Sequence, residues 1–455
     1  MKKIPRVMIA GTSSGCGKTT IVCGILSALK EMGVKAASAK CGPDYIDPMF
    51  HSQVFGIPSQ NLDLFFCTTE QVNYLLSQNS KKSSITVMEG VMGFYDGMEM
   101  ESTKASAYDL AKKTNTPVVL VVNAKGMAMS VLALIQGFLT FQKATPIKGI
   151  ILNGVSRAVG EKLKRMIEER FPVKVYGIVP KMTSFTLASR HLGLVTPYER
   201  KNLEQEITKL GQQCLEWLDI KGLLELAETA PDVSQQMPKE WERYLAKTKE
   251  KNLRVGVAWD LAFCFYYKEN LQILEKLGCE LVYFSPLQDT QLPKKIDAVL
   301  IGGGYPELYA KQLSENKTMC QSIKKAIQNG LPTLAECGGF MYLHEQMEDT
   351  KGDLYPMVGV IAGKTIRKDN LVRFGYAKLH AERENPYLAE GEEIKAHEFH
   401  YWDSENNGDS FRAVKPSGKR NWLCVHAQKN MIAGFPHFYY YSNLSFIVRF
   451  LKKCK

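Results

Sequence analysis

The sequence lacks several patterns that would each indicate a particular class of protein. No stretch of it holds the ~18 consecutive apolar residues that a membrane-spanning helix needs. Its first residues lead directly into a short apolar run that ends at Ala10, without the apolar core and cleavage site of a signal peptide, so we expect a cytoplasmic protein. The eleven cysteines are scattered and include no C-x-x-C pair, which argues against a disulfide framework and against a structural zinc site.

Internal repeats of roughly 20 to 50 residues and low-complexity tracts are also missing. The formal net charge of +11 favours anionic partners, which include nucleic acids, nucleotides and polycarboxylates, without choosing among them. Because there is no basic stripe interleaved with aromatics, no helix-turn-helix pattern and no RNP-type motif, we do not expect a nucleic-acid partner. With 45% hydrophobic and 23% charged residues, the composition is that of a globular protein.

A length of 455 residues exceeds what one hydrophobic core usually serves and indicates two domains. In the first part, short β-branched runs alternate with helix-length amphipathic segments, which predicts an α/β fold with a parallel sheet and helices on both faces. The expected strands lie at residues 4–10, 36–40, 85–89, 117–123, 147–153 and 173–179. We expect this domain to span residues 1–230.

The second part resumes the alternation after an interruption. A long helical stretch is predicted over 202–227, and turn formers and polar residues then break the pattern, so we expect a linker over 231–250. The second domain, also α/β, is expected at 251–455, with strands at 254–258, 280–284 and 298–301 and a helix at 266–277.

A glycine-rich loop at residues 10–20 lies between the first predicted strand and a helix. Backbone N–H groups and the helix N-terminus in such a loop cradle phosphate oxygens. The match to G-x-x-x-x-G-K-[ST] is imperfect, since Thr12 occupies the first glycine position and Gly11 lies one place earlier. A glycine turn without function is the alternative, disfavoured because strand, loop, Gly-Lys-Thr and helix coincide. The binding candidates are Gly15, Gly17, Lys18, Thr19 and Thr20, with Lys18 on the β and γ phosphates and Thr19 on Mg²⁺.

Acidic side chains follow the second and third predicted strands. Asp44 and Asp47 lie in a loop with glycine and proline, where open parallel sheets bind ligands, although aspartates there could also simply form a turn. Glu89 ends a buried apolar strand, as a Walker-B-like Mg²⁺ ligand does, because that strand end would otherwise bury an unpaired charge. Asp96 is the secondary candidate, for the metal or for the substrate.

A cysteine is the candidate nucleophile of the second domain. Cys337 follows an apolar strand-like run and precedes a helix, as in a nucleophile elbow, where the helix N-terminus is expected to lower the pKa of the thiol. A packed core cysteine is the alternative. The N–H groups of Gly303 and Gly338 could line an oxyanion hole, and His437 could be the general base that activates Cys337. His400, with a carboxylate nearby, competes for the role of base.

The segments of the first domain together resemble the cobyrinic acid a,c-diamide synthases, within the wider group of dethiobiotin-synthetase-like P-loop proteins. The family's G-T-x-S-G-x-G-K-T-T loop is present, which accounts for the offset glycine, and its Gly-Pro-Asp-Tyr-Ile-Asp-Pro and Glu-Gly-Val-Met-Gly runs are reproduced. A further family stretch at 189–194 holds Arg190 and His191, which would either suit an acidic substrate or form a solvated loop pair. Asn123 stands where relatives are expected to carry an aspartate.

Residues 250–455 resemble the class I glutamine amidotransferase domain of the cobyrinate and cobyric acid synthase type. In that type a C-G-G run carries the nucleophile and a histidine near the end of the domain is catalytic, which implies His437 rather than His400. Tyr439 stands where ordinary class I glutaminases place a glutamate, so the resemblance implies a Cys-His dyad. The run 397–401 is itself a family feature, with an implied supporting role. Runs at 258–270 and 284–287 closely match the a,c-diamide synthases.

The resemblance implies an ATP-dependent ligase of cobalamin biosynthesis. Its first domain would phosphorylate a carboxylate with Mg·ATP, with Thr19, Asp47 and Glu89 on the metal and Asp44 and Asp47 in catalysis. Its second domain would release ammonia from L-glutamine, and the ammonia would pass between the domains in a protected channel. The implied substrate is cobyrinic acid, amidated at its a and c carboxylates.

Three alternatives to this interpretation stay open. Hydrogenobyrinate or nickel-sirohydrochlorin could replace cobyrinic acid as the tetrapyrrole, because motifs do not separate ring systems. The remote alternative is a ParA/MinD-like ATPase without synthesis, against which the Cys337 and His437 pair argues. No membrane partner is expected, and the oligomeric state stays open, a homodimer included.

Overall fold

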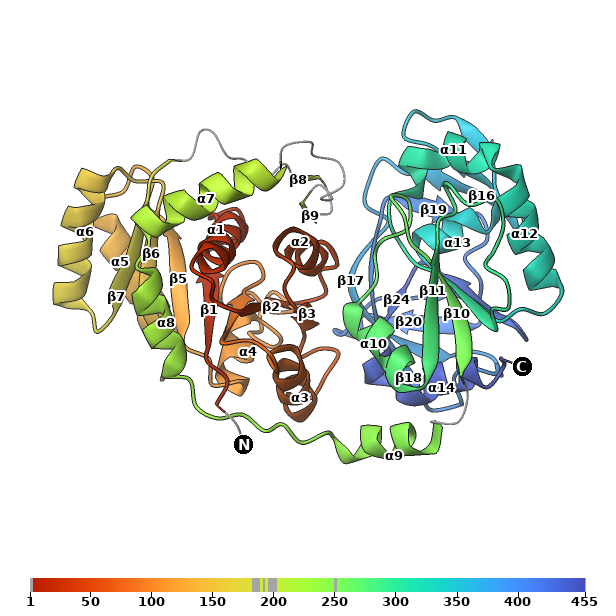
Figure 1. The fold of residues 1–455 in the computed structure, drawn as a ribbon, viewed down its shortest axis with the longest axis horizontal. Helices are drawn as coiled ribbons and strands as arrows, with labels where there is room; N and C mark the ends of the chain where they lie inside the picture. The colour runs from red at the N-terminus through yellow and green to blue at the C-terminus, as the bar shows by residue number, and fades with distance from the viewer. Residues whose placement is uncertain (1–2, 182–188, 191–192, 195–202, 249–251, 455) are drawn as a thin grey trace. The chain divides into compact units, whose positions relative to one another are not determined.

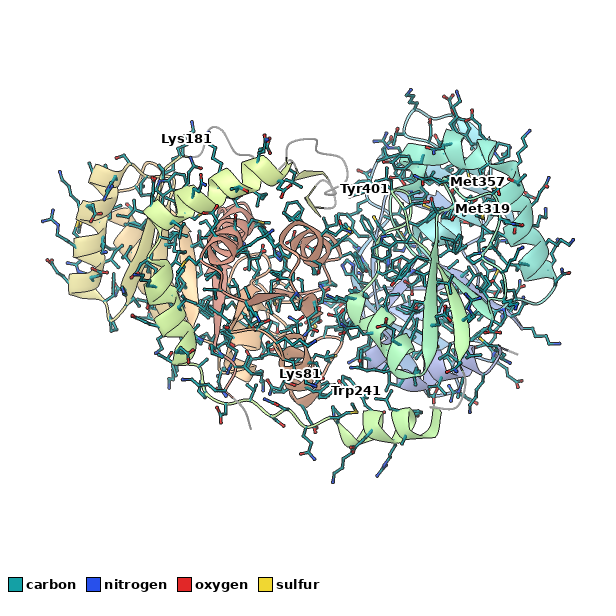
Figure 2. The ribbon with its side chains drawn as sticks, in the orientation of Figure 1. Lys81, Lys181, Trp241, Met319, Met357 and Tyr401 are labelled. Carbon is teal, nitrogen blue, oxygen red and sulfur yellow. The ribbon has the colours of Figure 1, made fainter. Side chains whose placement is uncertain are left out.

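The structure is a computed structural model that describes residues 3–181, 189–190, 193–194, 203–248 and 252–454. The chain divides into two compact units, Met1–Pro238 and Lys239–Lys455 (Figure 1). The division falls inside the segment 231–250, where we expected a linker. That segment holds the whole of helix α9 (Lys239–Thr248), whose Trp241 (Figure 2) is buried with its ring centroid 4.3 Å from that of Tyr441 in the same unit. A buried aromatic contact thus ties part of the expected linker to the second unit.

The first unit is built on a seven-stranded sheet in the order β3-β2-β4-β1-β5-β6-β7, and every neighbouring pair is parallel. This confirms the expected parallel α/β domain. The strands are β1 (Arg6–Gly11), β2 (Ala36–Cys41), β3 (Ser59–Leu62), β4 (Ile85–Glu89), β5 (Val118–Asn123), β6 (Ile147–Asn153) and β7 (Lys174–Val179). The short strands β8 (Ser189–Arg190) and β9 (Gly193–Leu194) form a separate antiparallel pair.

The helices of this unit are α1 (Lys18–Glu31), α2 (Ile46–Phe55), α3 (Thr69–Asn79), α4 (Ala107–Lys113), α5 (Ser130–Thr140), α6 (Arg157–Arg170), α7 (Leu203–Trp217) and α8 (Ile220–Glu228). Strands β1 and β4 are buried along their whole length, which is why they read as continuous apolar runs. Because all seven strands are parallel, the loops that follow β1, β2 and β4 leave the same edge of the sheet.

Two features of the first unit differ from the sequence expectation. The single helix expected over 202–227 is two helices, α7 and α8, because the side chain of Asp219 accepts a 2.8 Å hydrogen bond from the N–H of Gly222 and starts a new helix there. Strand β3 was not expected, since it carries polar residues rather than a β-branched run. It forms because β2 supplies its hydrogen-bond partners and the surrounding fold buries it.

The second unit contains a six-stranded sheet in the order β11-β10-β12-β13-β23-β22, parallel except at β22. Its strands are β10 (Leu253–Ala258), β11 (Cys279–Phe284), β12 (Ala298–Ile301), β13 (Thr333–Glu336), β22 (His426–Ala427) and β23 (Met431–Gly434). Its helical segments are α10 (Lys268–Lys276), η2 (Pro306–Tyr309), α11 (Ala310–Glu315), α12 (Lys317–Gln328), α13 (Gly338–Tyr342), η3 (Tyr440–Ser442) and α14 (Leu444–Leu451). Met319 and Met357, labelled in Figure 2, belong to the hydrophobic core of this unit.

Two further sheets of the second unit were not expected from the sequence. One has the order β15-β14-β16-β19 and the other β21-β20-β17-β18-β24. Their strands are β14 (His344–Glu348), β15 (Leu354–Pro356), β16 (Ile361–Arg367), β17 (Arg373–Ala381), β18 (Glu393–His400), β19 (Trp402–Ser404), β20 (Phe411–Val414), β21 (Asn421–Cys424) and β24 (His437–Phe438). Strand β24 pairs with β18, so that His437 lies opposite His397. In the part of the chain that the structure describes, no helix is both long enough and apolar enough to cross a membrane.

Candidate active sites

The glycine-rich loop connects β1 to α1, and its geometry explains why glycine stands at position 11 rather than at position 12. A Cβ added to Gly11 would lie 2.3 Å from Sγ of Cys16 and 2.9 Å from the Lys18 side chain. The position that must be glycine is therefore 11, and Thr12 can carry a side chain. Gly17 has a φ of 100° at the start of α1, a conformation that favours glycine. Asn153, which sequence reasoning missed, supports the loop by donating a 2.8 Å hydrogen bond to the carbonyl of Cys16.

Lys18 lies buried at this loop. Its ammonium group donates hydrogen bonds to the carbonyls of Ser13, at 3.0 Å, and Met92, at 2.6 Å. The second contact ties the loop to the segment that follows β4. Burial lowers the pKa of Lys18, which is the direction expected for a cation surrounded by protein rather than water. The other loop candidates, Gly15 and Thr20, lie in the loop and in the first turn of α1.

Four side chains from four different segments meet beside the loop. The hydroxyl of Thr19 donates a 2.6 Å hydrogen bond to Oε1 of Glu89 at the end of β4. The ammonium of Lys40, in β2, lies 2.7 Å from the same oxygen and 2.5 Å from Oδ2 of Asp47 in α2. Sequence reasoning found three of these residues but missed Lys40. The signal that could have found it is a charged residue near the end of a buried strand, as for Glu89.

Charge pairing inside this cluster opposes the effect of burial. Burial disfavours the charge of Lys40, yet Asp47 and Glu89 raise its pKa well above the ordinary value. Burial alone would raise the pKa of Asp47, but the Lys40 ammonium lowers it. For Glu89, which is 0% exposed, burial prevails over Lys40 and raises the pKa. The cluster therefore buries two carboxylates, those of Asp47 and Glu89, whose negative charge requires a cation beside them.

The oxygen atoms of this cluster fit a magnesium ion. The second oxygen of Glu89, Oε2, is buried and has no hydrogen-bond partner among the described residues. A hydroxyl and a carboxylate are ligands that Mg²⁺ prefers, with phosphate oxygens and water completing its octahedron. Within the described ranges, no group of three or more His, Cys, Asp or Glu side chains is arranged to hold a metal alone. The hydroxyl of Thr19 and Oε2 of Glu89 are thus the protein groups that fit, whereas Oε1 of Glu89 and Oδ2 of Asp47 both pair with Lys40.

Asp44 has a structural role in the loop before α2. Its Oδ1 accepts hydrogen bonds from the N–H groups of Ile46, at 2.8 Å, and Asp47, at 3.1 Å. Burial and the neighbouring Asp47 raise its pKa to about 7. The side chain of Asn61, another residue that sequence reasoning missed, donates to the carbonyls of Gly42 and Asp44 and holds the loop in place.

The remaining candidates of the first unit are less well connected. The side chain of Asp96 accepts a 2.8 Å hydrogen bond from the N–H of Gly93 and closes the turn after β4. Arg190 lies in β8, and His191 lies outside the described residues. The side chain of Asn123 accepts a hydrogen bond from the N–H of Lys125. The contacts of Asp96 and Asn123 assign no chemical role to these two positions.

Cys337 stands at a strained turn between β13 and α13. Its φ of 49° and ψ of −105° are unusual for a residue with a side chain, and its N–H donates a 2.8 Å hydrogen bond to the carbonyl of Gly434. Such strain is maintained only where the surrounding fold imposes it, and it is common at nucleophiles. Only 8% of the residue is exposed.

The imidazole of His437 and the side chain of Cys337 meet over Gly303. A Cβ added to Gly303 would lie 2.4 Å from Cε1 and 3.1 Å from Nε2 of His437, and 3.5 Å from Cβ of Cys337. A Cβ added to Gly338 would lie 3.2 Å from the backbone nitrogen of Gly304. The two glycine segments proposed for the oxyanion hole are therefore in close contact at the nucleophile.

The helix N-terminus was expected to lower the pKa of the thiol, but the net shift in this structure is upward. Burial, followed by the nearby Glu307, raises the pKa of Cys337 above its ordinary value, although the N–H of Gly338 acts in the opposite direction. Helix α13 has only five residues, so its dipole is too small to outweigh burial. A thiolate at this position needs a proton acceptor beside it.

His400, the competing base, is engaged elsewhere. Its Nδ1 lies 2.6 Å from the carbonyl of Trp402, its Nε2 lies 3.2 Å from Oε2 of Glu398, and its ring stacks on Phe435 with centroids 3.8 Å apart. Both ring nitrogens are thus committed to oxygen atoms. Burial, and then His400, lower the pKa of His437 to about 3, so its imidazole is neutral at physiological pH.

A carboxylate that sequence reasoning missed lies beside His437. Oε2 of Glu336 is 3.8 Å from Nδ1 of His437, and Oε1 accepts a 3.2 Å hydrogen bond from the N–H of Phe438. The signal was available in the sequence, because Glu336 is an acidic residue that ends a buried apolar strand, as Glu89 does.

Comparison with known proteins defines the class. Residues 7–195 match the family described as CobQ/CobB/MinD/ParA nucleotide binding domain, and residues 254–444 match the CobB/CobQ-like glutamine amidotransferase domain. The chain is 42% identical to the cobyrinate a,c-diamide synthase of Caldanaerobacter subterraneus subsp. tengcongensis, over 98% of each chain. The enzyme of the same name from Clostridium tetani is 39% identical over 98% of this chain and 99% of its own, and that from Priestia megaterium is 37% identical over 99% and 97%.

These matches place the chain among ATP-dependent carbon–nitrogen ligases that take nitrogen from glutamine. It belongs to the cobyrinate a,c-diamide synthase family. Among solved structures, that of PurLQS from Thermotoga maritima aligns with 44% of this chain and 99% of its own at 15% identity, with a TM-score of 0.31, a likeness too slight to bear on the site.

Proposed function

We propose that the chain converts the a and c carboxylates of cobyrinic acid into amides, with ATP activating each acid and glutamine supplying the nitrogen. One observation supports this above all: a single chain, similar to cobyrinate a,c-diamide synthases over 98% of its length, carries both a nucleotide loop and a cysteine–histidine centre. A ParA/MinD-like ATPase would have no use for the second of these.

The first unit would activate the acid. A carboxylate oxygen of the substrate attacks the γ-phosphorus of ATP, the bond to the β-γ bridging oxygen breaks, and ADP leaves an acyl phosphate behind. The loop N–H groups and Lys18 would hold the phosphates, and Thr19 and Glu89 would hold the Mg²⁺ that neutralises charge on them. Asp47 and Asp44, beside Lys40, would shape the acceptor side of this site.

The second unit would supply ammonia. The proton of the Cys337 thiol passes to Nε2 of His437 while the sulfur attacks the side-chain carbonyl of glutamine, and the N–H groups of Gly303 and Gly338 would bind the resulting oxyanion. His437 then protonates the leaving nitrogen, and ammonia and a thioester form. Water hydrolyses the thioester to glutamate. The ammonia attacks the acyl phosphate, and phosphate leaves.

The substrate and the coupling can be tested together. ADP release and amide formation would be measured with glutamine or ammonium as nitrogen donor and with cobyrinic acid, hydrogenobyrinic acid or nickel-sirohydrochlorin as acceptor. The proposal expects cobyrinic acid to be the preferred acceptor. A strong preference for hydrogenobyrinic acid or nickel-sirohydrochlorin would mean that this tetrapyrrole, and not cobyrinic acid, is the substrate. ATP hydrolysis without amide formation would exclude a ligase.

The variant Cys337→Ser separates the two halves of the reaction. It should lose glutamine-dependent amide formation and keep the ammonium-dependent reaction, because only the first needs a thiol nucleophile. Loss of both reactions in a folded variant would contradict two separate sites. All eleven cysteines are free and buried in the structure. Because the proposed reaction needs a reduced thiol and ATP, we place it in the cytoplasm.

A further inference from the structure

The residue directly before the nucleophile occupies an unusual place in the second unit. Glu336 is the last residue of β13, is 4% exposed, and lies opposite Gly434 of the neighbouring strand β23. A buried carboxylate costs several kcal/mol unless other groups compensate its charge. The groups that surround it therefore indicate what it does.

Two groups on consecutive residues face the two oxygens of this carboxylate. The N–H of Phe438 donates to Oε1 at 3.2 Å, and Nδ1 of His437 lies 3.8 Å from Oε2. The second distance is too long for a hydrogen bond, but it leaves the carboxyl group directly beside the imidazole. Contacts of this kind often tighten only when substrate binds.

The opposite edge of the imidazole faces the nucleophile. Cε1 and Nε2 of His437 and Cβ of Cys337 all lie within 3.5 Å of the point where a Cβ of Gly303 would stand. Nδ1 is thus directed toward Glu336 and Nε2 toward the cysteine. A histidine that takes a proton from the nucleophile and passes it to the substrate needs this tautomer, with a proton on Nδ1 and a lone pair on Nε2.

We propose that Glu336 is the positioning residue of the glutaminase centre: its carboxylate accepts the Nδ1 proton of His437, fixes the tautomer and stabilises the imidazolium that forms. This deepens the proposed function, on which it rests for the identity of the reaction. The thiol proton moves to Nε2 as the bond from sulfur to the amide carbon forms. The same proton leaves with the amide nitrogen, and the active form of Glu336, the ionised carboxylate, takes up no proton in either transfer.

The acid would then come from an unexpected place in the chain. Ordinary class I glutaminases place a glutamate two residues after the histidine, where this chain has Tyr439, and a dyad of Cys337 and His437 was expected for that reason. Here the acid would precede the cysteine instead. The parallel pairing of β13 with β23 makes this possible, because it brings the end of β13 beside the strand that leads to His437.

The rival explanation is that Glu336 only anchors the backbone of Phe438. The variant Glu336→Gln separates the two roles, because both groups facing the side chain act as donors and an amide offers a single acceptor oxygen. Glutamine can keep the bond to Phe438 or serve His437, but it cannot serve both and carries no charge. Glu336→Asp retains the charge on a side chain one methylene shorter.

The first measurement is the rate of alkylation of Cys337 by iodoacetamide as a function of pH, in the intact protein, with Cys337→Ser giving the background of the other cysteines. If Glu336 stabilises the imidazolium that pairs with the thiolate, loss of the carboxylate in Glu336→Gln should move the midpoint of this profile upward by about one pH unit, whereas loss of its direct repulsion of the thiolate alone would move the midpoint downward and contradict the proposal. Glu336→Asp should restore most of the shift. Equal midpoints in all three proteins would refute the proposal.

The second measurement compares nitrogen donors. Glu336→Gln should lower glutamine-dependent turnover by roughly 100-fold through kcat, the scale of one acid–base interaction, and leave ammonium-dependent turnover unchanged. The matched control is Asn270→Ser, because Asn270 bonds to the backbone of Phe438 and Tyr440 without an interaction with the imidazole. It should lower stability without moving the alkylation midpoint. A shift of the same size in this control would show that backbone anchoring alone accounts for the effect.

The two proposals fail in different ways. If wild-type protein amidates no tetrapyrrole with either donor, the proposed function fails, whereas the alkylation profiles still decide the role of Glu336. Should Glu336→Gln not fold, the Glu336→Asp variant decides: a midpoint near that of wild type supports a charged positioning residue, and a collapse of activity that spares the alkylation profile contradicts it.

Discussion

The hydroxyl of Thr19 donates a 2.6 Å hydrogen bond to Oε1 of Glu89, and this contact joins the first turn of α1 to the end of β4. The two residues lie 70 positions apart in the chain and come together because β1 and β4 are parallel neighbours. Since Oε2 of Glu89 has no hydrogen-bond partner among the described residues, the pair offers two oxygen ligands at the place where the phosphates of a nucleotide would lie.

Replacing Glu89 should therefore disable ATP chemistry alone. Glu89→Gln keeps the shape of the side chain but removes the charge that holds Mg²⁺. We expect the rate of ADP formation to fall by about 100-fold or more, while the hydrolysis of glutamine to glutamate, measured on its own, is retained. Coupled assays of ADP and of glutamate would measure both. Glu161→Gln, on the exposed face of α6, is the matched control and should change neither. Equal loss of both activities in Glu89→Gln would contradict the separation of the sites.

Lys40 should be a determinant of stability. It lies between Asp47 and Glu89, so Lys40→Met leaves two buried carboxylates without their cation, which typically costs about 3–5 kcal/mol. The loss should shrink as the pH is lowered, because Lys40 holds the pKa of Asp47 down and both carboxylates become protonated more readily without it. Urea unfolding across a range of pH measures this. Lys82→Met, at an exposed position, should have little effect, and a pH-independent loss in Lys40→Met would contradict the charge argument.

A single methyl group at Gly303 should block the glutaminase. The Cβ of Gly303→Ala would stand 2.4 Å from Cε1 of His437, too close for the imidazole to stay in place. We expect glutamine-dependent amide formation to fall by roughly 100-fold, as for a displaced catalytic group, with the ammonium-dependent reaction retained. Gly137→Ala, in α5 with nothing within 4 Å of the new Cβ, is the control. Wild-type glutaminase activity in Gly303→Ala would mean that His437 does not act at Gly303.

Glu336 should make stability depend on pH. Burial raises its pKa from an ordinary 4.5 to about 8, with the N–H of Phe438 acting in the opposite direction, so the folded protein holds this proton more tightly than the unfolded chain. The contribution of Glu336 to stability is therefore present below about pH 4.5 and is lost as the pH rises through about 8. Thermal unfolding of wild type and Glu336→Gln over this range should show that the melting temperature of the variant rises relative to that of wild type as the pH increases.

The same proton should govern the glutaminase rate. As Glu336 ionises near pH 8, it becomes able to stabilise the imidazolium of His437, so the wild-type rate should rise through this region. The other titratable groups that face Glu336 are Cys337, Tyr266 and Tyr440, and the pKa of each is raised by burial. They therefore stay neutral near pH 8 and should not produce this rise. A pH-independent wild-type rate would contradict the assignment.

Local chemistry along the chain was enough to predict much of this protein. The strands at Ile85–Glu89, Ile147–Asn153 and Ala298–Ile301 have the predicted bounds, because buried parallel strands are mostly apolar and rich in β-branched residues. Glycines and the Gly-Lys-Thr run mark the phosphate loop, since a tight turn next to a helix N-terminus needs those residue types wherever it occurs.

Only the tertiary structure decided which side chains lie in contact and act together at the two sites. The polar strand β3 exists because β2 provides its hydrogen bonds, and the antiparallel sheet that carries His437 arises from pairings between segments distant in sequence. The sequence marks Lys40 and Glu336 only as charged residues at buried strands, and their roles follow from partners that strand register brings to them. The pKa of Cys337 was predicted in the wrong direction because desolvation depends on everything packed around a thiol, which no local pattern contains.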